Sequence, residues 1–224
     1  MLQAIDLECQ RGERLLFTGL NFDVAAGTCL HVAGPNGAGK TSLQRILCGL
    51  LVPAAGEVRF RGENIRKLRE EYWQQLAYVG HLNGVKDDLS AEENVLFAAG
   101  LAGRVAHRDE VRAALAEVGL QGFEAQLARH LSQGQKRRVA LARLYLAARA
   151  TVWILDEPFT ALDVRGVGSL AALIASHLQR EGVVILTTHQ EVPIDGRVEK
   201  LTLVPAAAPG LLPADAEHDS EAAS

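Results

Sequence analysis

The clearest chemical pattern in the sequence is a glycine-rich segment near its start. Residues 34–42 read GPNGAGKTS and satisfy the phosphate-loop pattern G-x-x-x-x-G-K-[ST] at every fixed position. The glycines let the backbone curl with its N–H groups pointing inward, while Lys40 would reach the β- and γ-phosphates and Thr41 would coordinate Mg²⁺. The segment predicts a nucleoside triphosphate site, although the loop alone does not choose between a kinase, a GTPase and a transport ATPase. The predicted nucleotide-binding residues are Gly34, Pro35, Asn36, Gly37, Ala38, Gly39, Lys40, Thr41 and Ser42.

Two neighbouring carboxylates end an apolar run later in the chain. Residues 152–158, VWILDEP, deliver Asp156 and Glu157 together, and ligands bind at the carboxyl ends of parallel strands. Successive side chains on a strand alternate in direction, so the two carboxylates occupy different positions. We assign Asp156 to the Mg²⁺ shell and Glu157 to the attacking water, which favours hydrolysis over transfer to a substrate hydroxyl. The alternative is that these acids only cap a following helix.

A second anion-binding pattern lies at residues 131–143, LSQGQKRRVALAR. A tight, glycine-containing turn opens directly into a helix there, and Ser132 is placed to cap the helix start. Such an opening presents several unsatisfied backbone N–H groups. The cations at 136–138 are mildly unfavourable near a helix start. They either meet phosphate or ribose across a dimer interface or form a solvated face with nearby acids, and both interpretations stay open.

Short strands and a helix must position these loops. The first 33 residues read as short strands with a turn, leading into the phosphate loop. From Thr41 the apolar spacing becomes helical and continues to Leu50. The unbroken apolar runs within 151–158 and 182–189 are typical of strands in a parallel sheet that is covered on both faces.

The remaining segments add a hairpin, a helical region and a tail. Residues 56–65 read as a hairpin element, and residues 89–127 have an Ala-rich helical pattern. This pattern predicts a small helical subdomain, inserted at about residues 85–140. Residues 205–224 are rich in Ala, Pro and acidic residues, a composition that predicts a disordered acidic tail.

Composition bounds the function classes. Of the 224 residues, 48% are hydrophobic, enough for a well-filled core, and the formal net charge is −4. Four acids lie in the last ten residues, so the folded body is close to neutral, which argues against nucleic-acid binding. The three cysteines have no metal-ligand, redox or haem-attachment spacing and predict buried, reduced thiols in a cytosolic compartment. We expect no secretory signal and no membrane-spanning segment.

With Leu131–Gln135 placed before the acidic strand, the chain resembles the ATP-binding cassette (ABC) family over nearly all of residues 1–204. The resemblance implies an α/β fold, namely a P-loop NTPase cassette with a parallel core sheet, an N-terminal antiparallel β subdomain and the inserted helical subdomain. It also implies a homodimer that closes two ATP molecules between its subunits, with ATP and Mg²⁺ as cofactors. The residues that would contact the partner's nucleotide are Ser132, Gln133, Gly134, Gln135 and Asp163.

The same resemblance implies roles for residues outside these loops. His189 ends the TTH segment and matches the family's histidine that contacts the γ-phosphate. His81 stands where the family usually has Gln; it could touch the Mg²⁺ shell or the attacking water, or be an ordinary loop residue. Arg11 aligns near the aromatic that stacks on adenine, and a guanidinium plane can stack on a base. Gln133 replaces a usual Gly. The implied catalytic residues are Glu157, His189 and His81.

Three short segments narrow the resemblance to the ATPase subunits of bacterial haem exporters of cytochrome c maturation. They are GHLNG, LSQGQKRRVALARL and VILTTHQ. This implies a peripheral protein on the cytoplasmic face of the inner membrane, bound to separate membrane-spanning subunits, with ATP hydrolysis linked to haem delivery or release of the haem chaperone. No direct haem site is evident in the sequence. The segment from His81 to Asn94 would dock a helix of a membrane partner, although Ser90 and Glu93 also read as a capping box.

Three other functions compete with this hypothesis. The ATPase of a lipid or drug exporter would have the same chemistry and a different cargo. A cassette acting on ribosomes or DNA usually carries two cassettes or a long insertion, for which 224 residues have no room. A P-loop kinase is disfavoured by the LSQGQ segment and by Glu157.

Overall fold

A sheet of five parallel strands lies at the centre of the computed structural model, which describes residues 1–147 and 149–205. The two apolar runs form the strands at 152–156 and 183–187. Every residue of these two strands is buried, as expected for strands covered on both faces. All neighbouring strands are parallel, so their carboxyl ends meet at one edge. The strands in spatial order are β6 (Leu76–Val79), β7 (Val152–Asp156), β8 (Val183–Thr187), β3 (Thr28–Ala33) and β9 (Arg197–Thr202).

A second, antiparallel sheet is built mainly from the N-terminal region. Buried and exposed residues alternate along much of its first strand, because one face packs on the core. The expected N-terminal strands and the expected hairpin at 56–65 are both confirmed. The strands in spatial order are β2 (Arg14–Val24), β1 (Leu2–Arg11), β4 (Ala55–Phe60) and β5 (Glu63–Asn64).

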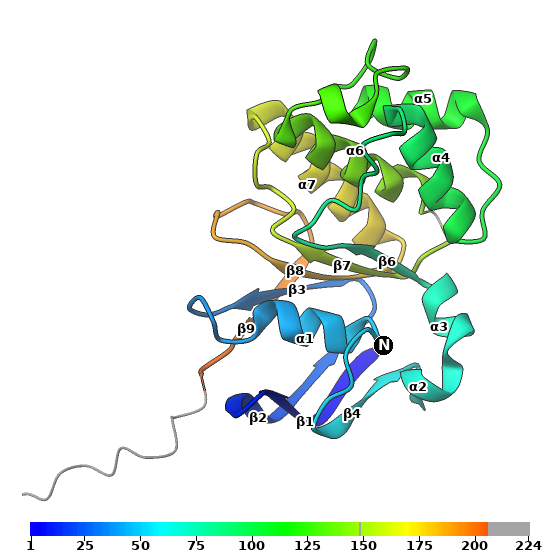
Figure 1. Ribbon diagram of the computed structural model, residues 1–224. Helices are drawn as coiled ribbons and strands as arrows, with labels where there is room; N and C mark the ends of the chain where they lie inside the picture. The colour runs from blue at the N-terminus through cyan, green and yellow to red at the C-terminus, as the bar shows by residue number, and fades with distance from the viewer. Residues whose placement is uncertain (148, 206–224) are drawn as a thin grey trace, which may run out of the picture.

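Helices cover both faces of the parallel sheet (Figure 1). On one face, α1 (Lys40–Leu47) and the antiparallel sheet share a core with the inward side chains of Val152 and Ile154. On the other face, α6 (Gln133–Leu146) and α7 (Val164–Gln179) pack on a core that includes Trp153 and Leu155. Alternating side chains of β7 therefore contribute to the cores on both faces of the sheet.

A helical region packs beside α6 and has its own hydrophobic cluster. It contains α4 (Ala91–Leu101) and α5 (Arg108–Glu117), which confirms the helical pattern at 89–127. Ser90 caps α4 in a capping box with Glu93. Because α6 contributes residues both to this cluster and to the core over β7, it connects the helical region to the sheet. The remaining short helices are α2 (Ile65–Leu68), α3 (Glu70–Gln74) and the 3₁₀ turn η1 (Ala128–His130).

The helix after the phosphate loop is shorter than its apolar spacing predicts. The expectation that it continues to Leu50 is wrong, because α1 ends at Leu47 and Leu50 is 62% exposed. Gly49 takes a left-handed φ of 71°, and the Leu50 N–H donates to the Arg45 carbonyl, which closes the helix as in a Schellman motif.

No helix among the described residues is long and apolar enough to span a membrane. Residues 206–224 of the expected acidic tail lie outside the described residues.

Candidate nucleotide site

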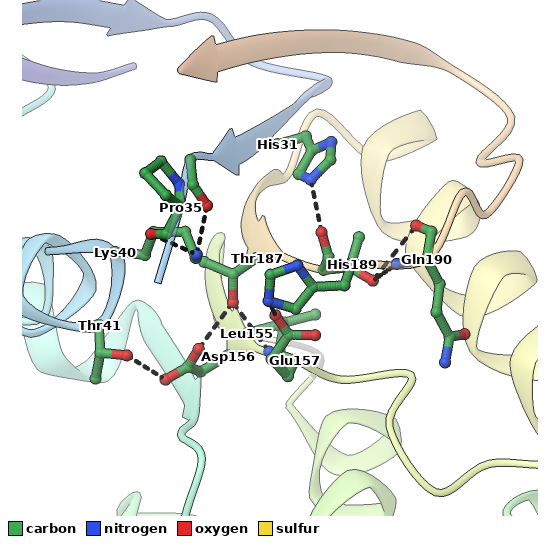
Figure 2. A network of polar contacts seen from close by, with 12 residues as sticks. His31, Pro35, Lys40, Thr41, Leu155, Asp156, Glu157, Thr187, His189 and Gln190 are labelled. Carbon is green, nitrogen blue, oxygen red and sulfur yellow. Dashed lines mark hydrogen bonds and ion pairs between the residues drawn. The ribbon is translucent and has the colours of Figure 1, made fainter. Parts of the chain in front are cut away.

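The phosphate loop joins the end of β3 to the start of α1. Gly34 has a φ of 142°, and a Cβ there would lie 2.6 Å from the carbonyl oxygen of Leu203, so a larger residue cannot replace it. Gly39 caps α1 in a left-handed conformation, with a φ of 99°. The Lys40 ammonium group bends back over the loop and donates to the carbonyls of Gly34 (2.7 Å) and Pro35 (3.2 Å), as Figure 2 shows. The loop therefore holds one cation at the centre of a curled backbone.

Asp156 is the polar centre of the site. It is buried, with 4% of its surface exposed, and its two carboxylate oxygens have different partners. Oδ2 accepts from the Thr41 hydroxyl at 3.1 Å and Oδ1 accepts from the Thr187 hydroxyl at 2.8 Å (Figure 2). Three elements meet here, because Thr41 lies on α1, Asp156 ends β7 and Thr187 ends β8.

The residues around Asp156 fit a bound Mg²⁺ ion. A carboxylate and a hydroxyl are the hard oxygen ligands that this ion takes from proteins, and its remaining ligands are usually phosphate oxygens and water. Thr41 and Asp156 supply one such oxygen each, side by side. Two protein oxygens leave the other positions around the ion to phosphate oxygens and water, so the pair is suited to an ion bound together with a nucleotide.

Glu157 turns away from Asp156 and lies beside His189. Its φ of 49° is left-handed, which is uncommon for a residue other than Gly. The Glu157 N–H donates to both the carbonyl (3.2 Å) and the hydroxyl (3.0 Å) of Thr187. Its Oε1 atom lies 3.5 Å from Nε2 of His189, an exposed side chain at the surface of the site (Figure 2). The expected pair of carboxylates thus has two separate surroundings, as strand alternation predicts.

Comparisons with known proteins agree with this arrangement. A sequence model described as ABC transporter matches residues 17–160 of the chain. The chain belongs to the ABC transporter family. Its similarity extends well beyond the phosphate loop and covers both the LSQGQ segment and the acidic strand end.

Curated relatives match nearly the whole cassette. The "Cytochrome c biogenesis ATP-binding export protein CcmA" of Dechloromonas aromatica is 52% identical over 204 residues, which cover 91% of this chain and 100% of that protein. The protein of the same name from Shewanella frigidimarina is 51% identical over 206 residues, covering 91% of this chain and 94% of the relative. The chain is therefore a homologue of these CcmA proteins and spans almost all of their length.

Solved ABC cassettes share the fold. An ABC transporter ATP-binding protein from Pyrococcus furiosus has 26% identity and a TM-score of 0.76, with 89% of this chain and 96% of that chain covered. A bacterial ABC transporter cassette solved as a dimer has 24% identity and a TM-score of 0.79, with 90% and 94% covered. These likenesses confirm the expected cassette fold with its parallel sheet, antiparallel sheet and helical region.

The LSQGQ segment of the cassette lies at the surface, at the start of α6. Ser132 caps this helix and accepts from the Gln135 N–H at 3.2 Å, while the Gln135 side chain accepts from the Ser132 N–H at 2.8 Å. A Cβ on Gly134 would lie 3.2 Å from the carbonyl oxygen of Ala161, so the segment approaches the loop before α7 closely. Asp163 ends that loop, where it caps α7 by accepting from the Gly166 N–H. The expected in-trans residues are therefore neighbours in this structure.

The three cations at 136–138 have separate environments. Lys136 lies 2.5 Å from Asp87, and Arg138 lies 2.8 Å from Asp163, so two of them pair with acids of the same chain. This agrees with the interpretation of a face paired with nearby acids for those two residues. Arg137 instead points inward, is buried and donates to main-chain carbonyls at the end of β7. Sequence reasoning missed it, because nothing in the KRR triplet distinguishes its middle member.

His81 and Arg11, to which the resemblance assigned roles at the nucleotide, both lie at the surface. His81 follows β6 and is exposed, and no hydrogen bond to its ring is formed within the described residues. Arg11 lies at the exposed end of the β1–β2 hairpin, paired in register with Arg14. The Arg14 guanidinium lies at the phosphate loop, 3.6 Å from where a Cβ on Gly37 would be. Arg14 is therefore a second cation beside the phosphate loop. Sequence reasoning did not name it, although it lies on the same hairpin as Arg11.

One further residue that sequence reasoning did not name, Gln44, ties the site together. Gln44 on α1 is fully buried, and its side-chain amide donates to the Leu155 carbonyl at 3.0 Å, which links the helix of the phosphate loop to β7.

Ser42, expected at the nucleotide, is buried against Cys9, and burial raises the pKa of that thiol despite the opposing hydrogen bond from Ser42. All three cysteines are buried and unpaired by disulfides.

Proposed function

We propose that this chain is the ATP-hydrolysing subunit of a membrane exporter that serves cytochrome c biogenesis, and that residues 1–204 act as one ATPase domain with a helical insertion at about 85–140. The observation that carries the proposal is the 52% identity to a cytochrome c biogenesis export protein over all of that protein's length. In this role the subunit couples ATP hydrolysis to haem delivery or to release of a haem chaperone.

The chemistry follows from the residues at the edge of the sheet. Lys40 and the loop N–H groups bind the phosphates, and Glu157 accepts the proton of the attacking water. His189, which lies 3.5 Å from Glu157, donates to the γ-phosphate. Thr41 and Asp156 would hold Mg²⁺, which supplies charge neutralisation on the phosphate oxygens. The buried bonds from Thr41 and Thr187 keep the Asp156 carboxylate in place for this purpose.

Two copies of the chain would complete each site. Ser132 and Gln133 are exposed at the start of α6, where N–H groups and the positive end of the helix dipole favour an anion. The γ-phosphate held by the partner's phosphate loop is the anion that this surface would receive. ATP then stabilises the closed homodimer by contacts that hydrolysis removes, and the dimer reopens.

The segment from His81 to Asn94 would bind the membrane partner on the cytoplasmic face of the inner membrane. Asn94 holds this segment rigid, because it accepts from the Lys86 N–H at 2.7 Å and donates to the Lys86 carbonyl at 3.0 Å. Leu82, near the start of this segment, is 82% exposed and would offer the partner an apolar side chain. The predicted capping box of Ser90 with Glu93 is present, and docking at this segment is proposed in addition to it.

Affinity purification tests the proposal. The tagged full-length chain is isolated from detergent-solubilised membranes of its native cell, and bound proteins are identified by mass spectrometry. Recovery of membrane subunits of cytochrome c maturation is the expected result. Leu82→Asp should abolish that recovery, while Leu50→Asp, which changes an exposed leucine outside the segment, should not. Recovery of a different permease would contradict the haem role alone, and recovery of no membrane protein would contradict the transporter role.

A further inference from the structure

Arg137 connects the helix of the LSQGQ segment to the catalytic edge of the sheet. Its guanidinium donates to the carbonyl of Asp156 at 2.6 Å and to the carbonyl of Glu157 at 2.8 Å. It also donates to the carbonyl of Gly80 at 2.8 Å, just beyond the end of β6. One side chain from α6 thus binds the main chain at the carboxyl ends of two neighbouring strands.

Burial of the Arg137 guanidinium is unfavourable in free energy, which is unexpected for a residue that only supports the fold. Arg137 is 5% exposed, its Nε atom has no partner among the described residues, and burial lowers its pKa from the ordinary value. Its direct partners are carbonyls and the side-chain amide of Asn83 rather than a carboxylate. Burying a cation is unfavourable unless hydrogen bonds compensate, and an apolar side chain often stabilises such a position better. Arg137 therefore has the features of a residue that positions neighbouring groups, not of one that mainly adds stability.

The geometry it controls is that of Glu157. The Glu157 N–H is held by Thr187 at 3.0 Å, and the Glu157 carbonyl is held by Arg137 at 2.8 Å. Both peptide groups that flank the Cα are thus fixed, while the residue itself has a left-handed φ of 49°. Such a conformation persists only when surrounding bonds over-determine it. The direction of the Glu157 carboxylate depends on these two bonds.

We propose that Arg137 is a positioning residue that fixes the main chain of Glu157 and couples it to the LSQGQ segment at the start of the same helix. The inference rests on the proposed function, in which Glu157 acts on the chain's own nucleotide and Ser132 contacts the partner's. Because Ser132 caps α6 and Arg137 lies in its second turn, a displacement of the helix start displaces the Glu157 carbonyl. The two nucleotides of a dimer are thereby linked through this one side chain.

Arg143 offers a matched control on the same helix. Its guanidinium is also largely buried and donates to main-chain carbonyls, those of Asn83 and Gly84, at 2.9 Å each. Burial lowers the pKa of Arg143 as it does that of Arg137. Arg143 donates to the loop after β6, whereas Arg137 also reaches the end of β7. Loss of Arg143 therefore removes a similar buried cation without releasing Glu157.

The test measures kcat and KM for ATP with the full-length chain and its co-purified membrane partners, for Arg137→Met, Arg137→Lys and Arg143→Met. We expect Arg137→Met to lower kcat by about 100-fold, the effect of a small misplacement of a catalytic group, with KM changed less than about threefold. Arg137→Lys, which keeps the charge and part of the bonding, should lie between it and the unchanged protein. Arg143→Met should keep kcat within about threefold. Thermal melting of each variant checks folding, and Arg137→Lys is the variant to read if Arg137→Met does not fold.

Combining Arg137→Met with Glu157→Gln separates positioning from general support. If Arg137 acts through Glu157, the double variant should have the residual rate of Glu157→Gln alone, because residues that act as a unit are not additive. An additional loss in the double variant, or equal losses of kcat for Arg137→Met and Arg143→Met, would overturn the inference. Full activity of Arg137→Met beside an inactive Glu157→Gln would overturn it and leave the proposed function standing. Full activity of Glu157→Gln would instead reject the proposed role of Glu157.

Discussion

His189 Nε2 lies 3.5 Å from Glu157 Oε1, and this contact joins two neighbouring strands of the parallel sheet. The register of the strands brings it about. Asp156 is paired with Thr187, so Glu157, the first residue after β7, and His189, the second residue after β8, leave the sheet at the same edge. Hydrogen bonds hold Glu157 at both its N–H and its carbonyl, whereas the His189 side chain is 63% exposed.

Glu157→Gln should leave ATP binding intact and lower turnover by at least about 100-fold, since general bases contribute about 10²- to 10⁴-fold. The amide is nearly the same size as the carboxylate but cannot take a proton from water. Nucleotide-bound dimer should then accumulate, which size-exclusion chromatography with light scattering detects. Glu117→Gln, at the end of α5, serves as the control and should hydrolyse normally. A Glu157→Gln protein with normal turnover would show that another group activates the water.

His189→Ala should lower kcat by about 100-fold, the usual cost of losing one donor to developing negative charge. Binding of ATP to the monomer should change little, because Lys40 and the loop N–H groups remain. Steady-state kinetics at saturating ATP, together with equilibrium binding of a labelled nucleotide, separates the two effects. Unchanged kcat in this variant would mean that His189 only neighbours Glu157 without acting on the phosphate.

Thr187→Val should weaken both the site and the fold. The hydroxyl donates to Asp156 at 2.8 Å and accepts from the Glu157 N–H at 3.0 Å, so the valine leaves a buried carboxylate oxygen without that donor. We expect a loss of about 1–3 kcal/mol in the free energy of unfolding and a reduced kcat. Thr187→Ser keeps the hydroxyl and should restore most of both quantities. Denaturant titration and ATPase assays check this, and a loss with serine but none with valine would assign the role to the methyl group.

Ser132→Arg tests whether the LSQGQ segment serves the partner's nucleotide. The bulky, charged arginine side chain should block closure of the dimer and abolish hydrolysis, while ATP binding to an isolated monomer stays unchanged. Ser132→Ala is the matched control, because it removes the cap of α6, worth about 1 kcal/mol, without adding bulk. It should retain more activity than Ser132→Arg. A fall in monomer affinity with Ser132→Arg would place the segment at the chain's own nucleotide instead.

The chemistry of the site was predictable where it depends on short segments. The phosphate loop, the paired acids and the cap at Ser132 each lie within a few consecutive residues, so composition and order suffice to locate them. The parallel strands were predictable for the same reason, since full burial on both faces requires an unbroken apolar run.

Contacts between distant segments were not predictable. Arg137 reaches the Glu157 carbonyl only because α6 packs across β7, and a single sequence contains no record of that packing. Gln44 appears in the sequence as an ordinary helical residue, although it is fully buried against β7. The end of α1 was misjudged for another reason, because the apolar spacing to Leu50 outweighed the stop signal of Gly49.

His177 should make the protein less stable at mildly acidic pH. The ring is buried on α7 and stacks on Trp153, with centroids 3.9 Å apart, and burial lowers its pKa from 6.5 to about 4. Between these two values the unfolded chain binds a proton that the folded chain does not, so the free energy of unfolding falls as pH drops from 6.5 toward 4, by up to about 3 kcal/mol.

Denaturant titrations at several pH values measure the contribution of His177, with His177→Phe as the test variant. Phenylalanine can keep the stacking on Trp153 but has no proton to bind, so the variant should lose stability less steeply than the unchanged protein between pH 6.5 and 4. His130→Gln, which replaces an exposed histidine, should keep the steep dependence. If His177→Phe and the unchanged protein have the same slope, carboxylates rather than this buried imidazole determine the acid sensitivity of the fold.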